Sequence, residues 1–190
     1  AVTVLVPNAE HIPVDRKFDC VVGTVRNAAG ALGGFTLKID SLQQVIVGGR
    51  GSFALSEPQD GAASQCDIIV DLSRHNPMFP AHEKREGYLR ADPTHVPSLA
   101  KVVFAASQLI GTFEKPLYVR LEESLCAHNR AEQTACSNCL NVCPTGAILS
   151  AGEHVTIDPM ICAGCGSCAA VCPSGAISYD APPVDTLFRR

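Results

Sequence analysis

The feature that most constrains this chain is a run of four closely spaced cysteines in its C-terminal part. Residues 162–173 read Cys-Ala-Gly-Cys-Gly-Ser-Cys-Ala-Ala-Val-Cys-Pro, which is the spacing C-x2-C-x2-C-x3-C-P. Three thiolates at two-residue gaps wrap the backbone around one iron–sulfur cubane, while the fourth, after a longer gap and before a proline, points toward a second cluster. The spacing therefore predicts an iron–sulfur centre and requires a second set of ligands elsewhere in the chain.

An internal repeat supplies this second set. Seven residues recur at an offset of 29 positions: Cys136, Cys139, Cys143, Pro144, Gly146, Ala147 and Ile148 match Cys165, Cys168, Cys172, Pro173, Gly175, Ala176 and Ile177. Gln133 stands where the offset expects a counterpart of Cys162, and the nearest other thiol is Cys126. The upstream motif is thus C-x9-C-x2-C-x3-C-P, with a widened first gap.

Two other uses of cysteine fit this pattern less well. A zinc ribbon has two separated C-x2-C knuckles and gives no role to a third cysteine two residues further on. A disulfide scaffold spreads its cysteines through a short chain, whereas eight of the ten here fall between Cys126 and Cys172. Iron–sulfur binding is therefore the preferred interpretation.

Residues 116–180 resemble the dicluster bacterial ferredoxins, apart from the widened gap. The resemblance implies two 4Fe-4S clusters and a ferredoxin-like fold whose halves are related by a pseudo-twofold axis. In that family each cluster takes three ligands from one motif and one from the other. Carried onto this sequence, cluster I is held by Cys126, Cys136, Cys139 and Cys172, and cluster II by Cys162, Cys165, Cys168 and Cys143.

The widened gap leaves the role of Cys126 as the one open assignment. A longer loop can still return its thiolate to the open iron at a modest entropic cost of closure, which favours Cys126 as the fourth ligand of cluster I. The alternative is that Cys126 is a buried thiol and cluster I has three protein ligands, as a three-iron cluster or with His128 as the fourth donor.

A broader resemblance covers residues 66–180. The runs at 111–119, 125–130 and 139–148 are similar to the middle of a group of long proteobacterial 4Fe-4S-binding proteins that carry further cluster motifs downstream. The chain also lacks an initiator Met, and its last residues read as a helix that has only begun. We therefore expect a fragment of a longer polypeptide, with further cluster domains of that polypeptide or a redox protein as its partner.

Composition limits the remaining function classes. A hydrophobic content of 46% with 18% charged residues describes a soluble globular protein, and no apolar run approaches a membrane span. The sequence lacks a signal peptide at its start, so a cytoplasmic protein is expected. Residues 116–190 carry 4 basic and 7 acidic residues, without the basic stripe that nucleic-acid binding needs.

The chain is expected to divide near Lys115. Residues 1–115 hold only two cysteines, Cys20 and Cys66, which are interpreted as buried apolar residues of strands. Strands are predicted at residues 2–6, 18–25, 35–39, 45–47 and 66–72, with turns at 28–34 and 48–53 and the last strand central in its sheet.

A helix is predicted at residues 98–110. It starts near Ser98 and stops at Gly111, and its apolar face, which includes Val102, Val103 and Ile110, is expected to pack on the sheet.

No catalytic signature is evident in residues 1–115. The glycine-rich run at 48–53 lacks the dinucleotide fingerprint, and no nucleophile–base pair stands out by spacing. His75, His82 and His95 lie in one irregular segment, but their spacing matches no metal-ligand template, so exposed loop histidines are the preferred interpretation.

The sequence thus predicts an α+β protein with a strand-rich N-terminal domain, residues 1–115, and a dicluster ferredoxin-like domain, residues 116–190. The expected function is electron transfer, as a carrier or as a wire segment of a larger oxidoreductase, with no catalysis by the chain alone. Two alternatives stay open: clusters that are purely structural, and a substrate site in residues 1–115.

Overall fold

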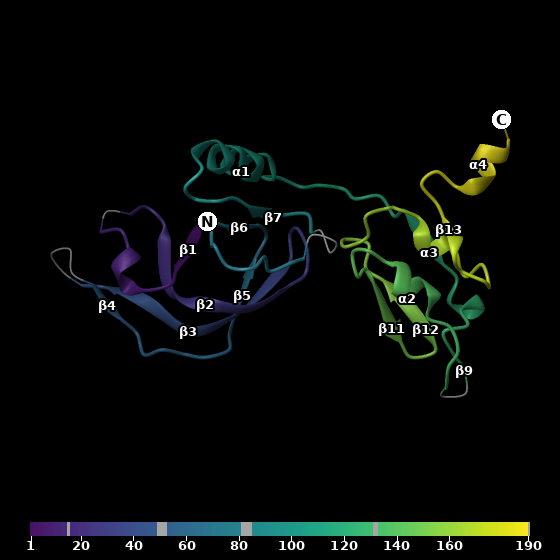
Figure 1. Ribbon diagram of the computed structural model, residues 1–190, viewed down its shortest axis with the longest axis horizontal. Helices are drawn as coiled ribbons and strands as arrows, with labels where there is room; N and C mark the ends of the chain where they lie inside the picture. The colour runs from purple at the N-terminus through teal and green to yellow at the C-terminus, as the bar shows by residue number, and fades with distance from the viewer. Residues whose placement is uncertain (15, 49–52, 81–84, 131–132, 190) are drawn as a thin grey trace. The chain divides into compact units, whose positions relative to one another are not determined.

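The computed structural model describes residues 1–14, 16–48, 53–80, 85–130 and 133–189. The chain contains both strands and helices, with strands predominating, and it packs into two compact units, Ala1–Ile69 and Val70–Arg190 (Figure 1). The domain boundary that the sequence predicts near Lys115 stays a prediction.

The first unit is built on one sheet. Its elements are β1 (Thr3–Val6), the 3-10 helix η1 (Ala9–His11), β2 (Asp19–Ala29), β3 (Phe35–Val47), β4 (Phe53–Leu55) and β5 (Ala62–Cys66). The strand order is β1-β2-β3-β4, with β5 also paired to β3; β1 and β2 are parallel, and the other pairs are antiparallel. The long ribbon of β2 and β3 is visible in Figure 1.

Alternating apolar side chains give this sheet its buried face. Phe35 and Ile39 of β3 are buried, and Cys20 and Val22 of β2 pack with Val6 and Ile12 in a small core. Cys20 is therefore a buried apolar residue, as predicted, while Cys66 at the end of β5 is half-buried. Burial raises the pKa of the Cys66 thiol, and the neighbouring carboxylate of Asp67 raises it further.

The turn between β2 and β3 requires glycine at Gly30. Its φ is 95°, and a Cβ atom there would lie 2.2 Å from the carbonyl oxygen of Gly34. A side chain would meet both backbone strain and a steric clash at this position. The predicted turn at 28–34 is therefore confirmed, although β2 runs on to Ala29.

Two strand predictions were wrong in detail. Residues 45–47 form the end of β3 rather than a separate strand, and they pair with β4. The run at 66–72 is interrupted: β5 ends at Cys66, and β6 (Ile69–Asp71) pairs with β7 (Tyr88–Arg90) in a two-stranded sheet. Val70 is exposed between buried Ile69 and Asp71, so the run alternates instead of being buried on both faces.

Of the turn predicted at 48–53, residues 49–52 lie outside the described part of the chain.

A hydrogen-bonded group joins β6 to β7. The Tyr88 hydroxyl donates to Asp71 Oδ2 at 2.5 Å, and the Met78 N–H donates to the Tyr88 oxygen at 3.1 Å. Arg90 Nε lies 3.5 Å from Asp71 Oδ2, so the buried carboxylate has a charged partner as well. Burial and the bond to Asp71 together raise the pKa of Tyr88 to about 12.

Helix α1 (Val96–Gln108) covers less surface than its apolar pattern predicts. His95 caps its N-terminus, where Nδ1 accepts the Ser98 N–H, and the helix packs beside β7. Val102 is buried, but Val103 is 57% exposed and Ile110, beyond the helix end, is 80% exposed. The prediction that this whole face packs on a sheet was therefore wrong, because the β6–β7 sheet is only two short strands.

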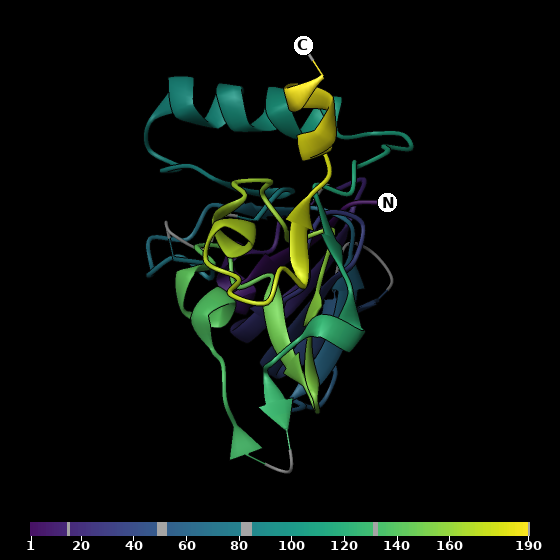
Figure 2. The same cartoon turned by 90° about the vertical axis from the view of Figure 1, so that its right-hand side faces the viewer.

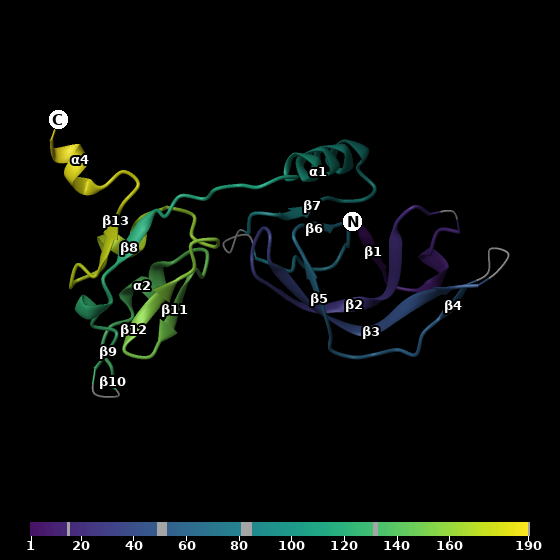
Figure 3. The ribbon, with the colours of Figure 1, turned by 180° about the vertical axis from the view of Figure 1, so that it is seen from behind.

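The C-terminal elements repeat a strand–helix–strand order. The first copy comprises β8 (Val119–Leu121), α2 (Asn138–Val142) and β11 (Ile148–Ala151), and the second comprises β12 (His154–Ile157), α3 (Ser167–Ala170) and β13 (Ile177–Tyr179). β8 pairs antiparallel with β13, and β11 pairs antiparallel with β12, so each copy contributes one strand to each pair. Figure 3 shows β8 beside β13 and β11 beside β12.

Three further elements complete the unit. The 3-10 helix η3 (Glu123–Leu125) follows β8, and a hairpin of β9 (Asn129–Arg130) and β10 (Gln133–Thr134) projects below the strand pairs in Figure 2. Helix α4 (Val184–Phe188) lies near the C-terminus, where the sequence predicts a helix start. The core between the strand pairs contains Ile148, Val155 and Ile177.

Candidate metal centres

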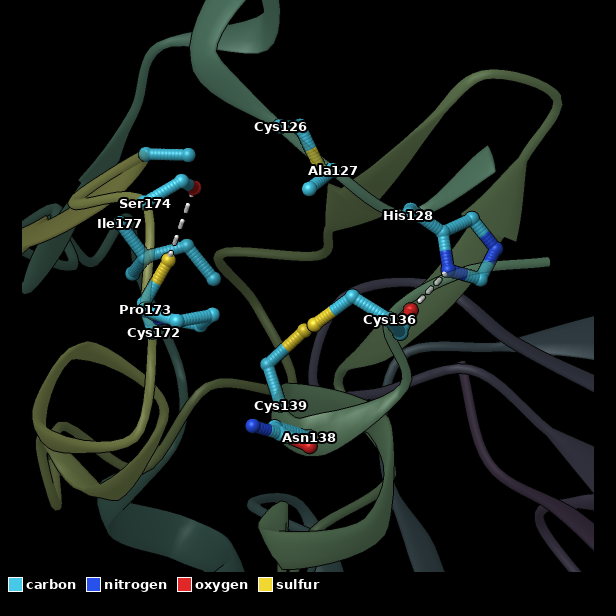
Figure 4. Close-up of a pocket in the computed structure, with 11 residues that line it drawn as sticks. Cys126, Ala127, His128, Cys136, Asn138, Cys139, Cys172, Pro173, Ser174 and Ile177 are labelled. Atoms are coloured by element: carbon cyan, nitrogen blue, oxygen red, sulfur yellow. Dashed lines mark hydrogen bonds between the residues drawn. The ribbon is translucent and has the colours of Figure 1, made fainter. Parts of the chain in front are cut away.

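One thiol-lined cavity of about 300 Å³ lies beside α2. Its four cysteines come from four places: Cys126 ends η3, Cys136 follows the β9–β10 hairpin, Cys139 lies in α2, and Cys172 follows α3. In Figure 4 their sulfur atoms point toward a common interior. These are the four residues that the sequence assigns to cluster I, and the structure brings all of them together.

A second cavity of about 310 Å³ lies beside α3. Its cysteines are Cys162, Cys165 and Cys168 from the downstream motif and Cys143 from the upstream motif. The set equals the one that the sequence assigns to cluster II. Each cavity thus takes three thiols from one motif and one from the other, and all eight are free.

The two cysteines that cross over sit in matching hydrogen-bonding environments. Cys143 Sγ lies 3.6 Å from the Thr145 hydroxyl, and Cys172 Sγ lies 3.6 Å from the Ser174 hydroxyl. Burial by itself would raise the pKa of both thiols. Hydrogen bonds to each sulfur outweigh burial, so the pKa of each thiol is lowered. Cys143 receives bonds from the side chain and N–H of Thr145 and from the N–H groups of Ala147 and Ile148. Cys172 receives bonds from the corresponding groups of Ser174, Ala176 and Ile177. These loops therefore favour the thiolate, the form that binds iron.

The two cysteines in helices α2 and α3 also resemble each other, but the pKa of each of these thiols is raised. Cys139 and Cys168 are both 8% exposed, and burial raises the pKa of each thiol, to about 11 for Cys168. Nearby thiols raise it further, because like charges in one cavity oppose each other. Such thiols stay protonated until a cation neutralises them, so metal binding would release their protons.

Apolar side chains line part of each cavity. Ile177 lines the first cavity, Ile148 and Ile157 line the second, and Val155 packs between the strand pairs with no exposed surface. Burial of this kind strengthens the electrostatic effect of every hydrogen bond to the sulfurs.

Aromatic rings close the loop that carries Cys165. Gly164 has a φ of 71°, and a Cβ atom there would lie 2.7 Å from the Tyr118 ring. The Tyr179 hydroxyl donates to the Gly164 carbonyl at 3.1 Å. Tyr179 lies in β13, and this bond holds the loop.

His128 is placed so that it does not compete with Cys126. It is 4% exposed, its Nδ1 lies 2.7 Å from the Cys136 carbonyl oxygen, and its Nε2 lies 2.7 Å from Ser150 Oγ. His128 lines the cavity, but both of its ring nitrogens have other partners, and the ring turns away from the sulfurs in Figure 4. Cys126 presents the free donor.

Two histidines of the irregular segment, His75 and His95, take part in structural hydrogen bonds. His95 caps α1, and the carbonyl of His75 accepts a hydrogen bond from Arg90. His82 lies outside the described residues. Among the residues that the structure describes, no three His, Cys, Asp or Glu side chains, the cavity cysteines included, are placed to hold a single metal ion. A 4Fe-4S cluster takes one thiolate at each of its four irons, so its ligands do not have to meet at one ion.

Sequence reasoning missed the hydroxyls of Thr145 and Ser174. Their signal was available, because a hydroxyl residue stands two positions after each crossing cysteine at the same 29-residue offset. It also missed Val155, whose alternation with His154 and Thr156 marks the buried face of β12.

One known family matches part of the chain that carries the cysteine motifs. Residues 133–176 match the 4Fe-4S dicluster domain, so the chain contains a ferredoxin-type dicluster domain. The match begins after Cys126. No curated protein matches the chain. No helix in the described ranges is long and apolar enough to cross a membrane.

Proposed function

We propose that this protein transfers electrons through two 4Fe-4S clusters, one in each cavity. The observation that carries the proposal is that each cavity is lined by four free cysteines drawn from both motifs. Four cysteine thiolates are the ligand set of a 4Fe-4S cluster. The donor set of each cavity fits that group.

Cluster I would be held by Cys126, Cys136, Cys139 and Cys172, and cluster II by Cys162, Cys165, Cys168 and Cys143. When bound, each cluster supplies a one-electron redox centre. The repeated strand–helix–strand order, with its exchanged strand pairs, supports a ferredoxin-like fold whose halves are related by a pseudo-twofold axis.

The chain's own residues would perform three tasks. The crossing cysteines receive N–H and O–H hydrogen bonds at sulfur, which stabilise added negative charge. Apolar residues such as Val155 exclude water. Small residues at 163, 164 and 166 let the backbone approach the sulfurs closely.

The proposed partner is a redox protein or further cluster domains of the same polypeptide. In the second case the chain would be one segment of a larger oxidoreductase that carries several clusters. A cytoplasmic location is proposed as well, since ten unpaired thiols suit a reducing compartment. Residues 1–115 are proposed to form a strand-rich domain distinct from the dicluster domain at residues 116–190.

A purely structural role for the clusters is the alternative. The test is a redox titration of the anaerobically reconstituted chain, followed by far-UV circular dichroism before and after one full cycle. The proposal expects uptake of about two electrons per chain, recovered on reoxidation with an unchanged spectrum. Clusters that cannot be reduced, or that are lost together with the secondary structure on reduction, would favour the structural role.

A further inference from the structure

The widened gap between Cys126 and Cys136 poses a problem that the downstream motif does not have. Cys162 and Cys165 are separated by two residues, and the short backbone fixes their spacing. Nine residues separate Cys126 from Cys136, and the β9–β10 hairpin is built within them. An insertion of this length lets the two thiols drift apart unless another contact holds its ends together.

The backbone of His128 makes the first such contact. Its carbonyl oxygen accepts the Ala135 N–H at 2.8 Å and the Cys136 N–H at 3.3 Å. These bonds close the base of the hairpin, two residues after Cys126 and directly at Cys136.

The side chain of His128 makes the second contact across the same base. A carbonyl oxygen can only accept, so Nδ1 carries the proton and donates to the Cys136 carbonyl at 2.7 Å. Nε2 forms the second bond, with the Ser150 hydroxyl at 2.7 Å. Ser150 belongs to β11, so the ring ties the insertion to the strand pair of the domain.

Because His128 is buried, the loss of either side-chain bond would be costly. The residue is 4% exposed, and a buried polar group that loses its partner bears the full cost of desolvation. One ring orientation satisfies both nitrogens, and this orientation sets Cys136 relative to the segment that carries Cys126.

We propose that His128 is a positioning residue that closes the widened loop and holds Cys126 and Cys136 at the spacing that cluster I needs. It does so through Cys136 and Ser150 and without binding iron. The inference rests on the proposed function, because it presupposes a cluster in the first cavity. It also explains how the chain tolerates an insertion inside a ligand motif.

The test compares five variants with the wild-type chain after anaerobic reconstitution. His128→Leu removes both side-chain bonds, His128→Asn keeps an N–H near the position of Nδ1, and Ser150→Ala removes only the second bond. His154→Gln is the matched control, since His154 is a half-buried histidine of the neighbouring strand β12 that pairs with Glu123 at 3.5 Å. Cys126→Ala identifies the electron paramagnetic resonance signal of cluster I.

Two readouts are followed: the two cluster signals, and the rate at which iron is released to a chelator. His128→Leu is expected to release cluster I iron roughly ten-fold faster than wild type or to lose that cluster, with cluster II unchanged. His128→Asn should recover part of the loss, Ser150→Ala should be intermediate, and His154→Gln should match wild type.

Cluster II is the internal control for folding, because it shares the same small domain. Equal loss of both clusters in His128→Asn and Ser150→Ala would assign His128 a general structural role and overturn the inference. If cluster I were unaffected in both His128 variants, the inference would be overturned, but the proposed function would stand. Absence of iron and sulfide from the wild-type chain would instead remove the proposed function, and this inference with it.

Discussion

Cys143 and Cys172 lie 29 residues apart and occupy equivalent positions, each with its sulfur 3.6 Å from a hydroxyl two residues further on. Under crossed ligation each belongs to the cluster of the other motif. Under the proposed ligation, the hydroxyls of Thr145 and Ser174 would therefore act on different clusters from the ones that their own motifs chiefly bind.

Removing these hydroxyls should shift the two reduction potentials separately. A hydrogen bond to sulfur stabilises the reduced, more negative cluster, so its loss lowers the potential. A bond worth about 0.5–1.5 kcal/mol corresponds to a shift of roughly 20–60 mV for one electron. Thr145→Val is expected to lower the potential of cluster II alone, and Ser174→Ala that of cluster I alone.

The measurement is a redox titration monitored by electron paramagnetic resonance, with Ser178→Ala as the control on the exposed face of β13. A Thr145→Val shift confined to cluster I would contradict crossed ligation. Absence of any shift in both variants would show that the hydroxyls do not act on the sulfurs.

Replacing Cys126 should affect one cluster only. In Cys126→Ala one iron of cluster I loses its anionic ligand, so that cluster is expected to convert to a three-iron form or be lost, while cluster II persists. The matched control is Cys66→Ala, which removes a half-buried thiol far from the motifs in sequence. Iron counts and electron paramagnetic resonance spectra that equal wild type in Cys126→Ala would move the fourth ligand elsewhere.

Tyr88→Phe should destabilise the second unit. The change leaves the buried Asp71 carboxylate without the phenol donor at 2.5 Å, at a cost of about 1–3 kcal/mol in the free energy of unfolding near pH 8. Denaturant unfolding checks this, with Tyr118→Phe as a control that keeps a ring against Gly164. Equal stability of Tyr88→Phe and wild type would show that the bond contributes nothing.

The effect of Tyr88 should also depend on pH at the alkaline end. Its folded-state pKa of about 12 lies above the unfolded value of about 10, so folding favours the neutral phenol. The stability that it contributes is full below pH 10 and is lost as the pH rises toward 12. The difference between wild type and Tyr88→Phe should therefore narrow over that window, and a difference that widened would contradict the assigned shift.

The candidate sites were more predictable than the fold around them, for a physical reason. A metal cluster dictates the spacing of its ligands, so C-x2-C-x2-C-x3-C-P carries the identity of Cys162, Cys165 and Cys168 in the sequence itself. The repeat extends this to Cys136 and Cys139. The two ligand sets inferred from resemblance match the two cavities residue for residue.

Features that depend on distant partners were not readable in this way. The exposure of Val103 follows from how little sheet lies beneath α1, and the break before Ile69 follows from the pairing of β6 with β7. From the sequence alone, His128 can be recognised only as a histidine two residues after Cys126. Its role becomes visible when Ser150, 22 residues away, is found against its ring.

The central claim is that each of the two cavities holds one four-iron cluster, and an iron and acid-labile sulfide determination on the anaerobically reconstituted chain tests it most directly. The account predicts about eight iron and about eight sulfide per chain, because eight thiolates in two sets of four bind two 4Fe-4S clusters. A sulfide content near zero, or zinc in place of iron, would contradict it.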